Sequence, residues 1–184
     1  PHRWRLSGAS SGLAVGSLVT GPGIAANTFV TGINGTTVTL SQNATATNAT
    51  AALVFLAPGL VLQQELTHDP ALGATLDGGL VKTGERNLVL LGSNTYTGPT
   101  NLFAGRLVMS TVTGSLASSS AIQFNSTAEF RADNFGAVGA GSVSLPRLVL
   151  AGDEATVALQ RSAAQDLTLT FGGLTRQQAS ATAN

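Results

Sequence analysis

Cysteine is absent from the 184 residues, so the chain can form neither a disulfide bond nor a cysteine metal site. Charge is scarce as well: Asp, Glu, Lys and Arg make up 10% of the residues, whereas about a quarter is typical of a soluble domain. The nine acidic and nine basic side chains balance, and without an excess of positive charge we expect no binding to nucleic acid. A net charge of zero also leaves little repulsion between copies, which favours self-association.

Long apolar runs are missing too. No run approaches the roughly 18 residues that a membrane-spanning helix needs, so we expect no transmembrane segment in this chain. The best candidate, residues 51–62, is interrupted by a Pro-Gly pair. Residues 1–12 lack the apolar core of a signal peptide, as expected of a trimmed chain or a piece of a longer one. The histidines, His2 and His68, have no metal-site partner at i+3 or i+4, and we expect neither metal nor cofactor.

Short β-strand signals dominate what remains. They are rich in β-branched residues and bounded by Gly, Asn, Asp or Ser. The expected strands lie within residues 36–42, 87–92, 106–110, 121–126, 128–133, 142–152, 155–160 and 166–173. Such a series predicts an all-β sandwich, barrel or solenoid. Because aromatic residues are only 5% and the apolar positions are mainly Val, Leu, Ile and Ala, we favour a parallel β-solenoid, whose narrow interior is filled by stacked aliphatic side chains.

The first part of the chain has a different pattern. In "INGTTVTL", the pair Asn34-Gly35 is typical of a tight hairpin turn with positive φ. We therefore predict a small β-hairpin module, or the first coils, over residues 1–50. Residues 51–78 are expected to form a connecting segment, and residues 79–184 to form solenoid coils.

An ordered pattern begins at Gly79. It reads Gly-x-x-Lys-x-Gly, Leu-x-Leu-x-Gly, Asn-x-Tyr-x-Gly, Thr and then Gly-x-Leu. Its positions are Gly79, Lys82, Gly84, Leu88, Leu90, Gly92, Asn94, Tyr96, Gly98, Thr100, Gly105 and Leu107. Over residues 79–109 this pattern resembles the autotransporter-associated β-strand repeat, also called the passenger-associated transport repeat. Arg86 stands where that family usually has a second glycine, which affects the turn before Leu88.

The resemblance implies a right-handed parallel β-helix. It also implies a protein that is secreted or displayed on the cell surface of a Gram-negative-type bacterium, of which this chain would be a fragment or subunit. Residues 12–41 and 167–184 are similar to sequences that accompany the repeat in very large surface proteins. The repeat is a structural unit, so the resemblance implies no catalytic residues.

The motif Asn94-Thr95-Tyr96-Thr97-Gly98 is open to two interpretations. It could be a ligand-contacting loop with an exposed tyrosine. We favour a structural turn in which Asn94 bonds nearby backbone, Gly98 supplies an unusual φ, and Tyr96 caps the apolar interior with its hydroxyl at the edge. Lys82, the only lysine, is expected to be a surface or turn contact. The leucines expected to face the interior are Leu88, Leu90, Leu102, Leu107, Leu148 and Leu150.

Three functions remain under consideration. The first is a structural solenoid segment that self-assembles into a fibre or stalk, by end-to-end or strand-edge stacking, because a solenoid end leaves strand edges unpaired. The second is an adhesin that binds a glycan or a host protein. The third is a polysaccharide hydrolase or lyase, which needs converging carboxylates. The acids are scattered and only Asp153 and Glu154 are adjacent, so we expect no enzyme.

Overall fold

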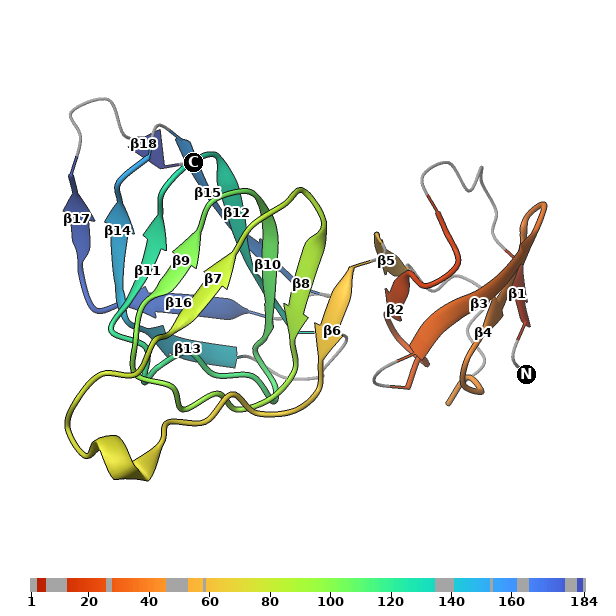
Figure 1. The fold of residues 1–184 in the computed structure, drawn as a ribbon. Coiled ribbons are helices and arrows are strands. Elements are labelled where there is room, and N and C mark those ends of the chain that lie inside the picture. The colour runs from red at the N-terminus through yellow and green to blue at the C-terminus, as the bar shows by residue number, and fades with distance from the viewer. Residues whose placement is uncertain are drawn as a thin grey trace. The chain divides into compact units, whose positions relative to one another are not determined.

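The computed structural model describes residues 3–5, 13–25, 28–45, 53–57, 59–134, 141–152, 154–161, 166–177 and 182–183. These residues form two compact units, one ending at Gly59 and the other beginning at Leu60 (Figure 1). Regular structure is nearly all β-strand, as predicted. The helical structure in the described part is a single 3₁₀ turn, η1 (Pro70–Leu72), and no helix there is long and apolar enough to cross a membrane.

The first unit is a five-stranded antiparallel sheet in the order β1-β4-β3-β2-β5. Its strands are β1 (Arg3–Arg5), β2 (Leu18–Thr20), β3 (Thr28–Asn34), β4 (Thr37–Leu40) and β5 (Val54–Leu56). The predicted hairpin is confirmed: Asn34 pairs with Thr37, and Gly35 in the turn has φ +57°. One buried cluster of this unit consists of Val19, Val30, Val38 and Leu40. The hairpin is thus the centre of a wider sheet.

The second unit is a parallel β-solenoid of about four turns, which confirms the predicted fold class. Sheet 1 contains β6 (Leu60–Leu62), β8 (Asn87–Leu90), β10 (Gly105–Ser110), β12 (Ala128–Asp133), β15 (Glu154–Gln160) and β18 (Thr182–Ala183). Sheet 2 contains β7 (Leu80–Lys82), β9 (Thr100–Leu102), β11 (Ala121–Phe124), β14 (Arg147–Leu150) and β17 (Leu174–Arg176). The last coils add a third sheet of β13 (Gly141–Leu145) and β16 (Leu167–Phe171). In each coil the chain passes from sheet 1 to sheet 2 and back.

Parallel pairing stacks equivalent positions of successive coils into columns. Leu88, Leu107 and Phe130 form one column in sheet 1, and Leu102, Phe124 and Leu150 form one in sheet 2. Because side chains alternate along a strand, every second residue enters the interior and meets the same position of the coil above and below. The predicted inward-facing leucines all belong to the buried core: Leu88, Leu90, Leu102, Leu107, Leu148 and Leu150.

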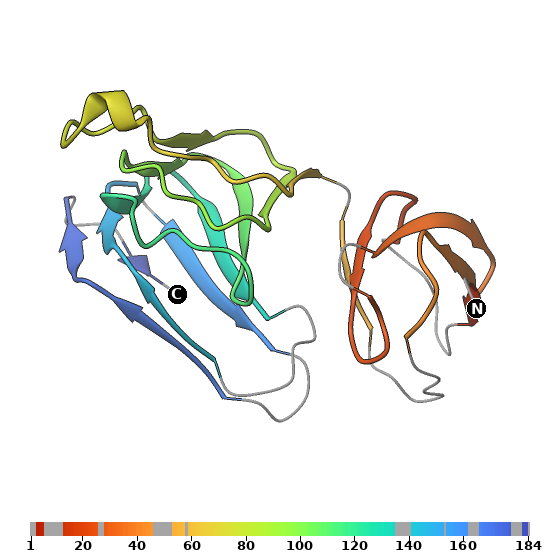
Figure 2. The ribbon, with the colours of Figure 1, turned by 90° about the horizontal axis from the view of Figure 1, so that it is seen from below.

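Residues 51–78, expected to be a connection, carry a strand of each unit: β5 pairs with β2, and β6 pairs with β8. We call residues 63–79, which lead from β6 to β7, the excursion. Its tip is η1, where the Asp69 carboxylate accepts a hydrogen bond from the Ala71 N–H at 2.9 Å. Figures 1 and 2 show η1 at the outer margin of the solenoid unit.

Candidate functional site

Four signature residues, Gly92, Asn94, Tyr96 and Gly98, lie in the loop between β8 and β9. We call residues 91–99 the repeat turn. It lies against β6 and the excursion of the preceding coil through backbone hydrogen bonds: Leu91 N–H donates to Leu62 O of β6 at 2.9 Å, and Thr95 N–H donates to Leu66 O of the excursion at 2.9 Å. The backbone of one coil therefore fixes the backbone of the next.

Asn94 extends this contact to three successive coils. The side chain is 2% exposed. Its Oδ1 accepts from Leu66 N–H at 3.0 Å, and its Nδ2 donates to Gly92 O at 2.9 Å and to Ser115 O at 3.2 Å. We expected bonds to nearby backbone. The structure adds partners in the coil before and the coil after, so this amide holds a stack rather than a single turn.

Tyr96 differs from its predicted position. It is 5% exposed, and its hydroxyl lies inside the solenoid rather than at the edge, 2.7 Å from Thr100 Oγ1. Thr100 Oγ1 is in turn 3.1 Å from Ser119 Oγ, which donates to Gly98 O at 2.9 Å. Burial raises the pKa of Tyr96 to about 12, with the Thr100 hydrogen bond opposing and the Asp77 charge reinforcing this effect. The phenol therefore remains neutral, and it is committed to an internal hydrogen-bond chain.

Two glycines of the turn are required by close approach. The expectation of an unusual φ at Gly98 is wrong, because its φ is outside the left-handed region. Instead, a Cβ at Gly98 would overlap the Asp77 carbonyl and the Gly79 backbone. A Cβ at Gly92 would lie 2.8 Å from Gln64 O. These positions are where the backbones of adjacent coils touch, so they have no room for a side chain.

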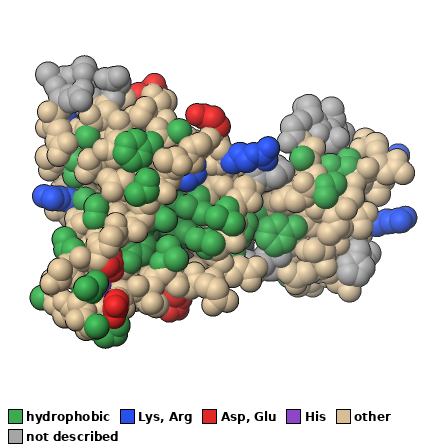
Figure 3. Space-filling model, viewed as in Figure 1, with side chains coloured by type: hydrophobic (Ala, Val, Ile, Leu, Met, Phe, Trp, Pro, Cys, Tyr) green, Lys and Arg blue, Asp and Glu red, His purple; other side chains and the backbone are tan. Residues whose placement is uncertain are grey.

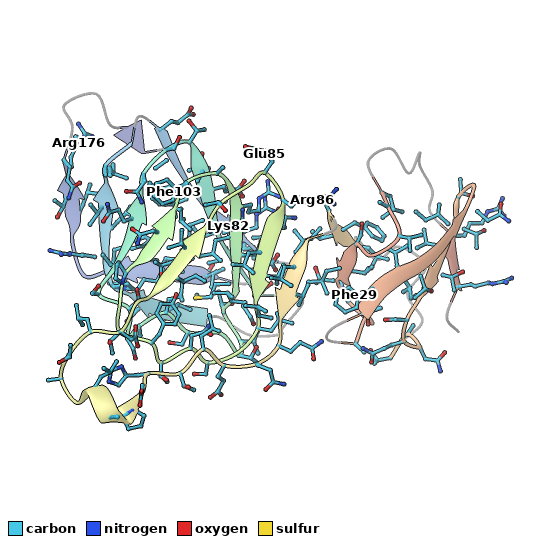
Figure 4. All side chains as sticks on the ribbon, viewed as in Figure 1. Phe29, Lys82, Glu85, Arg86, Phe103 and Arg176 are labelled. Carbon is cyan, nitrogen blue, oxygen red and sulfur yellow. The ribbon has the colours of Figure 1, made fainter. Side chains whose placement is uncertain are left out.

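Lys82 makes the expected turn contact, with the carbonyls that follow β7, but its side chain is buried rather than at the surface. In β7 the side chains alternate, with Leu80 partly buried, Val81 57% exposed and Lys82 5% exposed. Lys82 therefore points inward and pairs with Leu102 of the next coil (Figure 4). Its Nζ donates to the carbonyls of Thr83 and Ala104 at 2.8 and 2.9 Å, and to that of Gly84. Desolvation lowers the pKa of Lys82, while Glu85 opposes the change. The strand alternation was the signal that could have revealed this orientation.

Sequence reasoning did not single out Asp77, which links the excursion to the repeat turn. Its Oδ1 accepts from Gly98 N–H at 2.7 Å and from Gly79 N–H at 3.2 Å, and its Oδ2 accepts from Thr97 N–H at 2.9 Å. Desolvation acts to raise the pKa of Asp77. The backbone donors of Thr97 and Gly98, together with His68, outweigh it and hold the pKa well below its usual range. The carboxylate is therefore ionised, and it serves as an anchor.

His68 completes this cluster. Its Nδ1 lies 3.0 Å from Asp77 Oδ2 and 3.3 Å from Thr97 Oγ1, and its Nε2 lies 3.1 Å from Gly73 O. The hydrogen bonds to Asp77 and Gly73 raise the pKa of His68, against a smaller effect of desolvation. A Thr, a His and an Asp meet here, but the hydroxyl and the carboxylate both face Nδ1 while Nε2 faces a backbone carbonyl, so the cluster lacks the arrangement in which a base has the nucleophile on one ring nitrogen and the orienting carboxylate on the other.

Two further polar groups lie on the sheets. On sheet 1, Glu129 accepts from Arg106 Nη2 at 2.7 Å and from Arg131 Nε at 2.9 Å. Desolvation acts to raise the pKa of Glu129, and the two arginines overcome it to lower the pKa. On sheet 2, Gln123 Nε2 donates to Asn125 Oδ1 at 2.8 Å, and Asn125 Nδ2 lies 3.3 Å from Asn101 Oδ1.

The polar signature side chains thus all have partners: Lys82, Asn94, Tyr96 and Thr100. Within the described residues, no group of three or more His, Cys, Asp or Glu side chains could hold a metal ion. Of the one adjacent acid pair, Asp153 lies outside the described residues. The arrangement of the signature residues is suited to joining coils.

The family model described as the passenger-associated-transport-repeat matches residues 80–109. The match begins at the first residue of β7 and ends within β10, so it includes the repeat turn with Asn94, Tyr96 and Gly98. No curated protein and no solved structure matches the chain.

Proposed function

We propose that this chain is a structural segment of a secreted or cell-surface passenger, in which stacked coils form a rigid support. The observation that carries this proposal is the use of the signature residues. Asn94 joins three coils, Gly92 and Gly98 allow their backbones to touch, and Lys82 is bonded to three backbone carbonyls. Side chains committed to such contacts hold the stack together, and they are not available for chemistry on a substrate.

Display on a cell tests this proposal. The chain is fused ahead of an outer-membrane translocator barrel, and a tag at its N-terminus is detected on intact cells after protease treatment. We expect a surface-exposed product that resists protease, and a protease-sensitive product from Asn94→Ala, since Asn94 holds the coils. Retention of the wild-type chain inside the cell would contradict a passenger role.

We further propose that copies associate through the strand edges at the solenoid ends. In the described residues, β6 and β7 are the first strands of their sheets, and β17 is the last of sheet 2. Leu60 and Leu174 on these strands are 61% and 63% exposed. Figure 3 shows hydrophobic side chains gathered between β7 and β6. Exposed strand edges with apolar neighbours are templates for pairing with another chain.

The column of sheet 2 sharpens the test. Equivalent positions of successive coils in this column are occupied by Lys82, Leu102, Phe124, Leu150 and Arg176. The two cations, Lys82 and Arg176, lie at opposite ends of the column (Figure 4). If β17 of one copy paired with β7 of another in this register, Arg176 would lie beside Lys82, and like charges oppose such pairing. Sedimentation should therefore show Arg176→Glu associating at lower concentration than wild type. Both proteins remaining monomeric at all concentrations would exclude association through these edges.

A second candidate, an adhesin, is favoured by one observation. The amides of Asn101, Gln123 and Asn125 form a cluster. Phe103, two residues after Asn101, is 43% exposed. An aromatic face beside amide groups suits a sugar, whose faces are apolar and whose hydroxyls need partners. A glycan array with hits that Phe103→Ala abolishes would support this function, and an array without hits would refute glycan binding.

A further inference from the structure

His68 lies between the tip of the excursion and the repeat turn of the next coil. Its backbone N–H donates to Thr95 Oγ1 at 3.2 Å. Its two ring nitrogens face two different oxygens, Asp77 Oδ2 at 3.0 Å and Gly73 O at 3.1 Å. The side chain is 20% exposed, so protons reach it from solvent. One imidazole therefore contacts both Gly73, the residue that follows η1, and Asp77, near the end of the excursion.

The number of protons on the ring decides how many of these contacts are hydrogen bonds. An ionised carboxylate and a backbone carbonyl only accept, and a neutral imidazole has a single N–H to donate. A neutral ring can thus bond either Asp77 or Gly73, and its other nitrogen then turns a lone pair toward an oxygen. The Thr97 hydroxyl could donate to a bare Nδ1, yet Asp77 would still face that lone pair. Only the imidazolium satisfies both oxygens.

We propose that His68 is a protonation-controlled clamp on the excursion: the imidazolium holds Asp77 and Gly73 together, and the neutral ring releases Gly73. The release falls on Gly73 because the single N–H of a neutral ring makes a stronger, charge-assisted hydrogen bond to the Asp77 carboxylate than to a backbone carbonyl, and the N–H groups of Thr97, Gly98 and Gly79 hold that carboxylate in place. The tip near Gly73, which carries the exposed side chains of Leu72 and Leu76, then loses its side-chain tether.

The charges around the ring define the pH range of the clamp. The groups that act on His68 are Asp77 and Asp69, both in the excursion, while the repeat turn presents the hydroxyls of Thr95 and Thr97. The pKa of His68 is raised from 6.5 and that of Asp77 is lowered from 3.8. The stabilisation by His68 is therefore complete below pH 6.5, the ordinary value, and is lost as the pH rises through the higher folded value. Asp77 supports the clamp until the pH falls through its own lowered pKa.

The first test measures the ring itself. Because His2 is the only other histidine, the His2→Gln variant leaves one imidazole for a proton NMR titration. We expect His68 to titrate above 6.5, the ordinary value. A value at or below 6.5 would overturn the proposal, because the folded state would then gain nothing from the proton.

The second test follows the excursion. The N–H groups of Gly73 and Thr75 donate to Pro70 O and Leu72 O, and their hydrogen exchange is measured from about pH 5 to about pH 8, the range in which histidine changes charge, with correction for intrinsic exchange. Protection should fall across this range by about tenfold for each unit by which the pKa of His68 is raised. His68→Gln should show no such fall, because the glutamine amide does not titrate. The same pH dependence in both proteins would overturn the clamp, and the amides of β10 should be unchanged in each.

Discussion

The two units solve the same problem, the register of a sheet, by different means. In the antiparallel unit the two-residue turn at Gly35 and Thr36 aligns β3 with β4 locally, since Asn34 pairs with Thr37. In the solenoid every described pair joins strands of successive coils, and long loops separate the partners along the chain. There the alignment depends on contacts between loops and on the interior columns. The signature residues of the solenoid thus align neighbouring strands, as the hairpin turn does in the antiparallel unit.

The largest effect is expected from Leu90→Asp, which places a carboxylate in the interior, where Leu90 is 1% exposed. A buried charge without a partner costs several kcal/mol, so the β8 and β10 amides should lose NMR dispersion while those of β3 and β4 retain theirs. Leu174→Asp is the matched control, because Leu174 is 63% exposed. A folded solenoid in Leu90→Asp would contradict the inward orientation of Leu90.

The next largest is expected from Asn94→Ala. It removes three hydrogen bonds to backbone groups of three coils, and unpaired buried groups should lower the free energy of unfolding of the solenoid by about 3 kcal/mol. Denaturant unfolding measures this loss. Asn101→Ala, in the surface amide cluster, serves as the control and should change stability little. Equal effects of the two substitutions would show that Asn94 does not hold the stack.

A smaller loss is expected from Gly92→Ala, since the added methyl meets Gln64 O at 2.8 Å. Overpacking of this kind should cost about 2 kcal/mol, measured by the same unfolding experiment. Gly78→Ala is the control, because a Cβ at Gly78 has nothing within 4 Å and its φ is not left-handed. If both variants have the unfolding free energy of wild type, the backbones at Gly92 and Gln64 can move apart without loss of stability.

The smallest effect is expected in the antiparallel unit, from Gly35→Ala. A Cβ at Gly35 meets no atom within 4 Å, but its φ is +57°, and a left-handed alanine costs about 1 kcal/mol. Thermal unfolding followed at the β3 and β4 amides should shift slightly, and the solenoid amides should not. A loss as large as that of Gly92→Ala would mean that Gly35 makes contacts beyond its turn.

Sequence patterns located the longer strands well. Short strand-like runs bounded by turn residues mark β4, β8, β10, β12 and β15, and the inward leucines follow from the alternation of side chains along a strand. The three-residue strands β6, β7 and β17 were not separately predicted, because so short a run has little local preference and is held by its parallel neighbours. The turn contact expected for Lys82 is present, but the surface alternative was wrong: a lone charge is normally exposed, whereas the position of Lys82 after Leu80 and Val81 matches an inward residue.

The amino-acid sequence by itself determined the all-β class, the hairpin at Asn34-Gly35 and the repeat signature, since these depend on local turn preference and on a period of two. The tertiary structure decided what Asn94, Gly98 and Lys82 contact, and it brought His68 beside Asp77 and Gly73. The physical reason is that these partners belong to other coils or to the far side of a loop. Their proximity exists only once the coils are stacked, and no spacing along the chain encodes it.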